Sequence, residues 1–462
     1  MSVGIFFWIG LLLYKYYSLA FYDWDLAFFS QAMWCLSHGS TYVSLFDTNF
    51  FANHANLIAY FLVPVYKVFP HPFTLLVFKL VSFFGASYFL YLIAKEKLGE
   101  RPALIILLLY YIYAPNIYGL CYEFDFENLA PIFIMLIFYY YKKEDWIAFL
   151  ISGIFLILIK ENLPLIICAY GIHGFLTRKD KIRWGIIPFI IGALSFLSLA
   201  LIFVPLMAKN GIGQHPYMGH YSVLINDTLK CPRRIFGLLT TVRNWKLFGH
   251  LFAPLMFLPL LSPGILFLAA PIFLQHLLSN SWQEHSIAYG YTMTVAPFVF
   301  LAFISTLAFI KQRFSKVVFS LVLLVTVCLN MTDVLQQMKL YAIRYMDFNL
   351  TATAPQRWQL LKMVPPQSPV IATFNFLPPL SQRSFVYAFH KMYDPEYQNE
   401  RWSYQLPESV HYALIDFNDS WLKSALKINV LHTKVCLQRF FKSGHWVARK
   451  RYGTAVLYQR RE

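Results

Sequence analysis

Two aspartates, Asp23 and Asp25, stand one residue apart in the segment that follows the first apolar run of the chain. A carboxylate at a membrane surface, under aromatic side chains, can act as a general base toward a hydroxyl group. Two such carboxylates could also share a divalent cation, Mg²⁺ or Mn²⁺, with phosphate oxygens. The structural alternative is that residues 26–36, whose apolar side chains recur at helical spacing, form an interfacial helix for which Asp25 is the N-cap.

A second group of ionisable residues occurs deeper in apolar sequence. Glu123, Asp125 and Glu127 alternate with aromatic residues, and Glu127 could simply stabilise the start of the next helix. Lys160 and Glu161 lie between two apolar runs with almost no loop to solvate them. Ionisable groups at such depth are usually paired and often functional. The two could neutralise each other, or Lys160 could meet the acidic cluster of the neighbouring loop.

Residues 209–246 carry six Lys or Arg against one acidic residue, which suggests an anionic partner. Lys230, Arg233 and Arg234 could hold a phosphate, since a guanidinium donates two hydrogen bonds to one phosphate group. Contact with lipid phosphates explains these cations equally well. His220 lies just upstream, and we expect it at a polar interface rather than on a metal, because no third ligand has a clear spacing.

The amino-acid composition indicates that these ionisable residues belong to an integral membrane protein. The chain has 462 residues, 58% of them hydrophobic and 13% charged, which excludes a water-soluble enzyme, a disordered regulator and a fibrous repeat. No groove-reading motif accompanies the net charge of +16, so nucleic acid is not an expected partner. Apolar stretches predict about eleven spans, centred near Ile9, Phe84, Leu108, Met135, Phe155, Ile167, Leu197, Phe257, Phe267, Phe300 and Val322.

The basic turns predict the orientation. Lys and Arg gather in residues 95–101, 142–143, 178–183 and 311–316, which fall on one side if the spans alternate. That side is the cytoplasm by the positive-inside rule, so the N-terminus is cytoplasmic and the acidic residues face outward. The first outer loop is then long, and its second apolar segment, after His54, is too short to span.

The composition changes after Asn330, which predicts a transmembrane domain over 1–332 and an extracytoplasmic α/β domain over 333–462. Short apolar segments at 369–374, 384–389, 412–417 and 455–458 predict strands of a small sheet. Residues 357–363, ahead of the first of these segments, predict a helix.

The order of motifs along the chain resembles the bacterial membrane-protein family called domain of unknown function 2079. The residues that carry this resemblance are 25–34, 38–39, His54, 64–66, 72–76, 126–131, 160–162, 252–263, Tyr291 and 296–298, with 365–366, 380–383, 386–387 and 414–416 in the tail. The chain departs from the family pattern at Ser30, where a second Asp is usual, and at Gly290, where a His precedes the tyrosine.

That family is similar to GT-C glycosyltransferases, multi-span enzymes that use polyprenyl-phosphate sugars and place a catalytic carboxylate in the first outer loop. The resemblance implies Asp25 as the base, with Asp23 as an alternative. It places Glu127 and Glu161 at acidic positions without an assigned role. The candidate substrate-binding residues are therefore His54, Glu127, Lys160, Glu161, His220, Lys230, Arg233, Arg234 and Tyr291.

We therefore predict an α-helical polytopic protein of the bacterial inner membrane with a GT-C-like fold and a small C-terminal α/β domain. The predicted activity is inverting transfer of a sugar from a polyprenyl-phosphate donor to an extracytoplasmic glycan, lipid or protein. The alternative hypothesis is a non-catalytic polyprenyl-lipid-binding or carrier protein. A secondary transporter ranks third, because no inverted repeat is detectable.

Overall fold

The computed structural model describes residues 2–208, 233–345, 348–398 and 404–461. Its contacts divide the chain into two compact units. The helical unit consists of Met1–Ile5, Phe51–Phe61 and Val77–Arg344, and the mixed unit consists of Phe6–Phe50, Leu62–Leu76 and Tyr345–Glu462. The predicted boundary at 332 falls inside a helix, and the mixed unit also takes in parts of the first 76 residues. The assignment of 333–462 to a separate extracytoplasmic domain stays a prediction.

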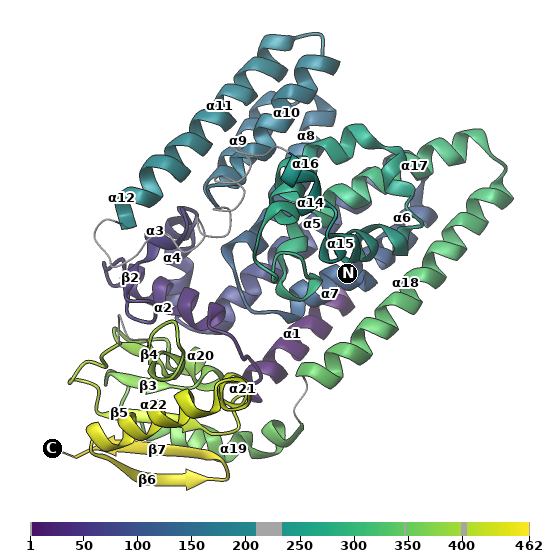
Figure 1. The fold of residues 1–462 in the computed structure, drawn as a ribbon. Helices are drawn as coiled ribbons and strands as arrows, with labels where there is room; N and C mark the ends of the chain where they lie inside the picture. The colour runs from purple at the N-terminus through teal and green to yellow at the C-terminus, as the bar shows by residue number, and fades with distance from the viewer. Residues whose placement is uncertain (1, 209–232, 346–347, 399–403, 462) are drawn as a thin grey trace. The chain divides into compact units, whose positions relative to one another are not determined.

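The helical unit is built from apolar helices (Figure 1). They are α5 (Pro72–Leu98), α6 (Glu100–Ile112), α7 (Ala114–Cys121), α8 (Ala130–Lys143), α9 (Trp146–Ile157), α10 (Pro164–Thr177), α11 (Ile187–Leu197), α12 (Val204–Ala208), α14 (Arg233–Leu239), α15 (Val242–Phe252), α16 (Pro263–Leu278), α17 (Ala296–Arg313) and α18 (Lys316–Tyr345). Among the described residues, four helical stretches are long and apolar enough to cross a membrane, and the bent pair α6–α7 would make a fifth. The expected count of about eleven spans stays a prediction.

The apolar run around Phe257 is not the centre of a helical span. Ala253–Leu255 and Leu258–Leu261 form two short 3-10 turns, and Phe257 between them has a φ of 55°. Prolines at 254 and 259 lack the amide hydrogen that a continuous helix needs. The span expected there is therefore wrong, although the hydropathy of the segment is high.

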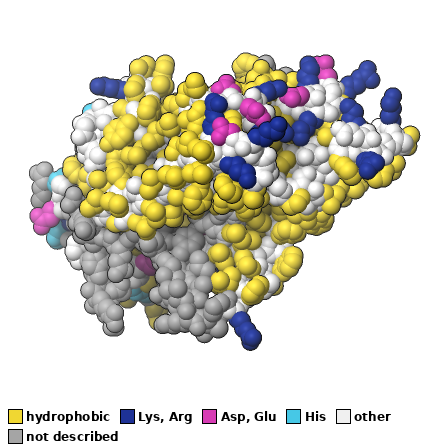
Figure 2. All heavy atoms as spheres, turned by 90° about the horizontal axis from the view of Figure 1, so that it is seen from above, with side chains coloured by type: hydrophobic (Ala, Val, Ile, Leu, Met, Phe, Trp, Pro, Cys, Tyr) yellow, Lys and Arg dark blue, Asp and Glu magenta, His cyan; other side chains and the backbone are white. Residues whose placement is uncertain are grey.

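The four basic turns lie together at one end of the helical unit, as predicted. Three contacts join them: Lys143 Nζ to Glu96 Oε2 at 2.9 Å, Arg178 to Glu144, and Lys311 Nζ to the carbonyl oxygen of Leu98 at 2.9 Å. Figure 2 shows Lys and Arg side chains gathered with a few acidic ones among hydrophobic side chains. This clustering is the pattern that the positive-inside rule uses.

The chain between α1 (Ser2–Tyr17) and α5 contains short elements rather than an extended loop. They are α2 (Asp25–Ser37), β1 (Tyr42–Val43), β2 (Thr48–Asn49), α3 (Phe50–Asn53) and α4 (Ala59–Val68). The helix predicted over 26–36 is confirmed. Trp24 occupies its N-cap position without a side-chain cap bond, so the assignment of Asp25 as N-cap is wrong. Asp25 is instead the first helical residue, where a carboxylate favours the helix dipole.

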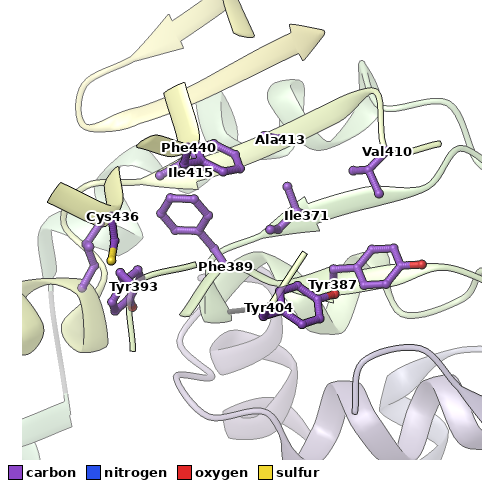
Figure 3. Packing of buried hydrophobic residues seen from close by; sticks show 11 residues of the cluster. Ile371, Tyr387, Phe389, Tyr393, Tyr404, Val410, Ala413, Ile415, Cys436 and Phe440 are labelled. Atoms are coloured by element: carbon purple, nitrogen blue, oxygen red, sulfur yellow. The ribbon is translucent and has the colours of Figure 1, made fainter. Parts of the chain in front are cut away.

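The C-terminal part of the mixed unit is a five-stranded sheet with helices. Its elements are α19 (Phe348–Lys362), β3 (Val370–Ala372), α20 (Leu377–Leu380), β4 (Val386–Ala388), β5 (Tyr412–Asp416), α21 (Ser420–Ile428), α22 (Val430–Ser443), β6 (Trp446–Tyr452) and β7 (Ala455–Arg460). The strand order is β4-β3-β5-β7-β6, in which β4, β3 and β5 are parallel and the other pairs are antiparallel. All four predicted strands and the predicted helix are confirmed. Aromatic and aliphatic side chains fill the core between sheet and helices (Figure 3).

Candidate functional site

A buried ion pair lies in the helical unit between the loop before α8 and the turn after α9. Lys160 Nζ donates to Glu127 Oε2 at 2.6 Å, and the two side chains are 7% and 5% exposed. The Lys160 ammonium also lies 5.8 Å from the ring centroid of Tyr291. Lys160 therefore meets the acidic cluster of the neighbouring loop, which is one of the two predicted alternatives. Glu127 Oε1 is buried and has no hydrogen-bond partner among the described residues.

Glu161, the next residue after Lys160, has different partners, which lie in the segment that follows α3. Its Oε1 lies 2.7 Å from His54 Nδ1, and its Oε2 accepts a hydrogen bond from the amide of Ala55 at 3.0 Å. Both oxygens of the buried Glu161 carboxylate therefore have partners in this segment. The structure thus brings His54, Glu127, Lys160, Glu161 and Tyr291 into one cluster, which we call the buried ionic cluster.

The loop that carries Glu127 is held in place by local hydrogen bonds. The side chain of Asp125 accepts from the Glu127 amide at 2.7 Å, and Asn128 Oδ1 accepts from the Asp125 amide at 3.1 Å. This capping box satisfies amides that a helix start leaves unpaired. Asp125 is therefore a cap, whereas the side chain of Glu127 is free to reach Lys160.

Sequence reasoning missed Lys79, which anchors the same loop. Lys79 is fully buried, and its ammonium donates to the carbonyl oxygens of Gly119, Leu120, Tyr122 and Glu123 at 2.7–3.3 Å. A cation at this place favours the negative end of the α7 dipole. The available signal was a single lysine within an apolar helix.

A second buried pair, also missed, lies beside Tyr291. His276 Nδ1 is 3.2 Å from Glu284 Oε2, and Ser279 Oγ donates to Glu284 Oε1 at 2.8 Å. The rings of His276 and Tyr291 are 5.9 Å apart. Tyr291 thus joins this pair to the buried ionic cluster. Gly290 before it has a φ of 78°, a left-handed backbone conformation that favours glycine.

The two candidate bases belong to the mixed unit. Asp23 and Asp25 are half-buried on either side of Trp24, and Asp23 Oδ1 accepts from the Trp24 amide at 3.0 Å. Aromatic rings of Phe46, Phe374, His390 and Trp421 surround the Trp24 ring at centroid distances of 5.2–6.0 Å. We call these five rings the aromatic clamp. It fixes the short segment on which both carboxylates stand.

Helix α2 is joined to the C-terminal sheet by buried polar contacts. Gln31 Nε2 donates to the carbonyl oxygens of Arg383 and Ser384 at 3.2 and 3.1 Å. Ser30 is fully buried, and its hydroxyl lies 2.8 Å from both Tyr66 Oη and Ser381 Oγ. Ser30 therefore joins helices where the family pattern has a carboxylate.

Two other residues of the family motifs in the C-terminal tail, Arg383 and Asp416, also make structural contacts. Arg383 donates to the carbonyl oxygens of Leu380 at 2.8 Å and Ser368 at 2.7 Å, and burial lowers its pKa to about 10. Asp416 at the end of β5 pairs with Arg357 of α19 and accepts from Thr454 Oγ1 at 2.7 Å. These contacts stabilise the sheet and its connections, and none of them provides a reactive group.

The basic candidates are only partly described. His220 and Lys230 lie outside the described residues. Arg233 and Arg234 begin α14 in the helical unit; Arg233 is exposed, and the side chain of Arg234 is outside the described part of the chain. Within the described residues no group of three or more His, Cys, Asp or Glu side chains is placed to hold a metal ion. The divalent-cation hypothesis stays a prediction.

A known protein family matches nearly the whole chain. The model of the family described as "Predicted membrane protein (DUF2079)" matches residues 15–447. The chain belongs to the DUF2079 family. No curated protein matches this DUF2079 member.

Two solved structures of ArnT from Cupriavidus metallidurans are similar to the DUF2079 chain. The one bound to undecaprenyl phosphate has 12% sequence identity and a TM-score of 0.51, and the apo state has 11% and 0.48. Each match covers 99% of this chain and 98% of the other. The undecaprenyl-phosphate-bound structure confirms the predicted architecture: this DUF2079 protein is a mostly helical membrane protein with a GT-C-like fold and a small C-terminal sheet.

Proposed function

We propose that the chain is a GT-C-type membrane glycosyltransferase that moves a sugar from a polyprenyl-phosphate donor to an extracytoplasmic acceptor with inversion. The observation that supports this most is the fold, which is similar over 99% of the chain to that of ArnT bound to undecaprenyl phosphate. The position of Asp25 agrees with it, because the residue opens a helix of the first loop, where the resemblance expects the catalytic carboxylate.

In the proposed reaction Asp25, or Asp23 in its place, accepts the proton of an acceptor hydroxyl. The acceptor oxygen forms a bond to the anomeric carbon from the face opposite the phosphate. The bond from that carbon to the phosphate oxygen breaks, and its electron pair leaves with the lipid phosphate. Arg233, Arg234 and Lys230 would stabilise the charge that develops there, which is where catalysis gains most from fixed cations.

We assign the buried ionic cluster to the polar part of the substrate. Glu127 Oε1 is a buried acceptor without a partner in the described chain, and a sugar hydroxyl would satisfy it. Lys160 holds the Glu127 carboxylate in place, His54 pairs with Glu161 next to Lys160, and Tyr291 offers an aromatic face beside the Lys160 ammonium. We place this end of the helical unit at the outer surface of the bacterial inner membrane and the basic turns in the cytoplasm.

The test is sugar transfer in proteoliposomes that contain a radiolabelled polyprenyl-phosphate sugar. We expect Asp25→Asn, alone or with Asp23→Asn, to lower transfer by at least about a hundredfold while donor binding persists. Arg233→Gln with Arg234→Gln should weaken donor binding as well. Unchanged transfer in the Asp23→Asn, Asp25→Asn double variant contradicts the mechanism.

One observation favours the non-catalytic alternative, a polyprenyl-lipid-binding or carrier protein. Ser30, where the family pattern has a carboxylate, is committed to hydrogen bonds with Tyr66 and Ser381. A carrier would bind the lipid phosphate through Arg233 and Arg234 and show no turnover in the wild-type chain. The same assay separates the two functions, because only the enzyme releases polyprenyl phosphate.

A further inference from the structure

Helices α21 and α22 expose large apolar side chains that the sheet does not cover. Ile428, Leu431 and Val435 are 75%, 81% and 52% exposed. The same helices pack on the sheet through other residues, which are Leu422, Cys436 and Phe440; Figure 3 shows Cys436 and Phe440 in that core. The three exposed residues are therefore not part of the core between the helices and the sheet. An exposed apolar patch of this kind marks an interaction site.

The charged residues of α21 and α22 all have one sign. Residues 420–443 contain five Lys or Arg and no Asp or Glu. Lys423, Lys427, Lys434 and Lys442 are exposed beside the apolar residues. Basic helices with exposed apolar side chains are typical of segments that lie on anionic lipid. An anionic headgroup layer would complement both the lysines and the apolar side chains.

Contacts within the mixed unit place the start of α21 near the end of the apolar helix α1. Trp421 Nε1 donates to the carbonyl oxygen of Tyr22 at 3.0 Å, five residues after α1 ends at Tyr17. The rings of Tyr16 and Tyr17 contact that of Trp358 at 5.9 Å. Tyr and Trp gather at membrane–water boundaries. Ile428 lies roughly 10 Å along α21 from Trp421, at the rise of an α-helix.

We propose that α21 and α22 form a lipid-contact surface on which Ile428, Leu431 and Val435 enter an anionic headgroup layer. The lysines around them bind the lipid phosphates. The surface ties the C-terminal sheet to the bilayer independently of any chemistry. It does not depend on the proposed glycosyl transfer.

Photo-crosslinking of the full chain in lipid nanodiscs tests the proposal. A photoreactive phenylalanine analogue is placed at Leu431 or, as the control, at Lys450, an exposed residue of β6 in the same unit. With radiolabelled phosphatidylglycerol, we expect several-fold more labelled protein from position 431. Equal labelling from the two positions, or crosslinking of 431 to a second copy of the chain, would overturn the proposal.

The role of charge is tested in the same assay. A basic residue near an anionic surface strengthens attraction roughly fivefold. Lys423→Gln, Lys427→Gln and Lys434→Gln together should therefore lower lipid labelling at 431 at least about fivefold, whereas Arg449→Gln on β6 should leave it unchanged. Equal labelling from phosphatidylglycerol and phosphatidylcholine would overturn the anionic preference.

Discussion

At the scale of single residues, the charges in apolar surroundings are compensated by defined partners. Lys160 binds Glu127, Glu161 binds His54, and Lys79 binds four carbonyl oxygens. An ion taken out of water loses several kcal/mol of hydration, which a well-placed partner restores. Removal of one partner is therefore expected to cost more than removal of both.

Lys160→Met should lower the free energy of unfolding by about 3–5 kcal/mol, because it leaves Glu127 as a buried charge. The double variant Lys160→Met, Glu127→Leu should recover most of that loss. Chemical unfolding in detergent measures both. Lys143→Met, which removes the exposed pair with Glu96, is the control and should change stability little. A double variant no more stable than Lys160→Met contradicts the ion-pair account.

Asp419 provides a pH-dependent prediction in the mixed unit. Burial raises the pKa of this carboxyl from 3.8 to about 7, although it accepts hydrogen bonds from the amides of Trp421 and Leu422. Because the folded pKa exceeds the unfolded one, protonation stabilises the fold. This contribution is complete below about pH 4 and is lost as the pH rises through 7.

Asp419→Asn keeps a capping oxygen but cannot ionise, so it should abolish this loss, which is on the order of 4 kcal/mol. Thermal unfolding of both chains between pH 4 and 7 provides the comparison. Glu408→Gln, at an exposed carboxylate of the same unit, should keep the wild-type profile. An Asp419→Asn profile parallel to that of the wild type would refute the assignment.

The sequence predicted that Lys160 and Glu161 have charged partners, because two charges between apolar runs require them. It left their partners open, since Glu127 and His54 are 33 and 107 residues away from them. Lys79 was missed because its partners are carbonyl oxygens, which carry no sequence signal. The ring contacts of Trp24 join segments up to 397 residues apart, from Trp24 to Trp421, and only the folded chain brings them together.

At the scale of elements, helix α2 and the C-terminal sheet form one compact unit around the candidate bases. The other four rings of the aromatic clamp pack against Trp24, and Trp421 also donates a hydrogen bond to the carbonyl oxygen of Tyr22. Under the proposed function, this packing positions Asp23 and Asp25. A misplacement of about 1 Å can cost about a hundredfold in rate.

Trp24→Ala should therefore lower kcat for sugar transfer by about tenfold to a hundredfold, with little change in KM for the donor. Trp24→Phe, which keeps an aromatic ring in the clamp, should restore most of kcat. Steady-state kinetics of the three chains in proteoliposomes measure the effect. A loss confined to KM, or an equal loss in both variants, would show that Trp24 does not position the bases.

Strands with a clear apolar pattern were predicted from the sequence, whereas strand β6 and the 3-10 turns at 253–261 were not. Strands β3, β4, β5 and β7 are short buried apolar runs, which the alternation of segments reveals. Strand β6, Trp446–Tyr452, was missed because four of its seven residues are exposed and three are basic, so it lacks a buried apolar run. Residues 253–261 were misassigned as a span because hydropathy does not register the prolines that force 3-10 turns.

At the scale of the whole molecule, the proposed membrane orientation rests on the four basic turns, which we place in the cytoplasm. The odd number of spans predicted from the sequence then puts the C-terminus on the outer side. Alkaline phosphatase fused after residue 462 should then be active in bacteria, because it folds outside the cytoplasm. Green fluorescent protein fused at the same place should be dark, because it does not fold after export by the general secretion route. Fusions within the turn at 142–145 should show the reverse. The opposite pattern would invert the proposed topology.

The proposed function requires a polyprenyl phosphate to bind where Asp25 or Asp23 can act on its sugar. An experimental map of the full chain in nanodiscs with a polyprenyl-phosphate sugar tests this most directly. We expect a lipid density whose phosphate contacts Arg233 or Arg234 and whose sugar reaches Asp25 or Asp23. A phosphate bound elsewhere, or arginines and aspartates that face opposite compartments, would contradict it.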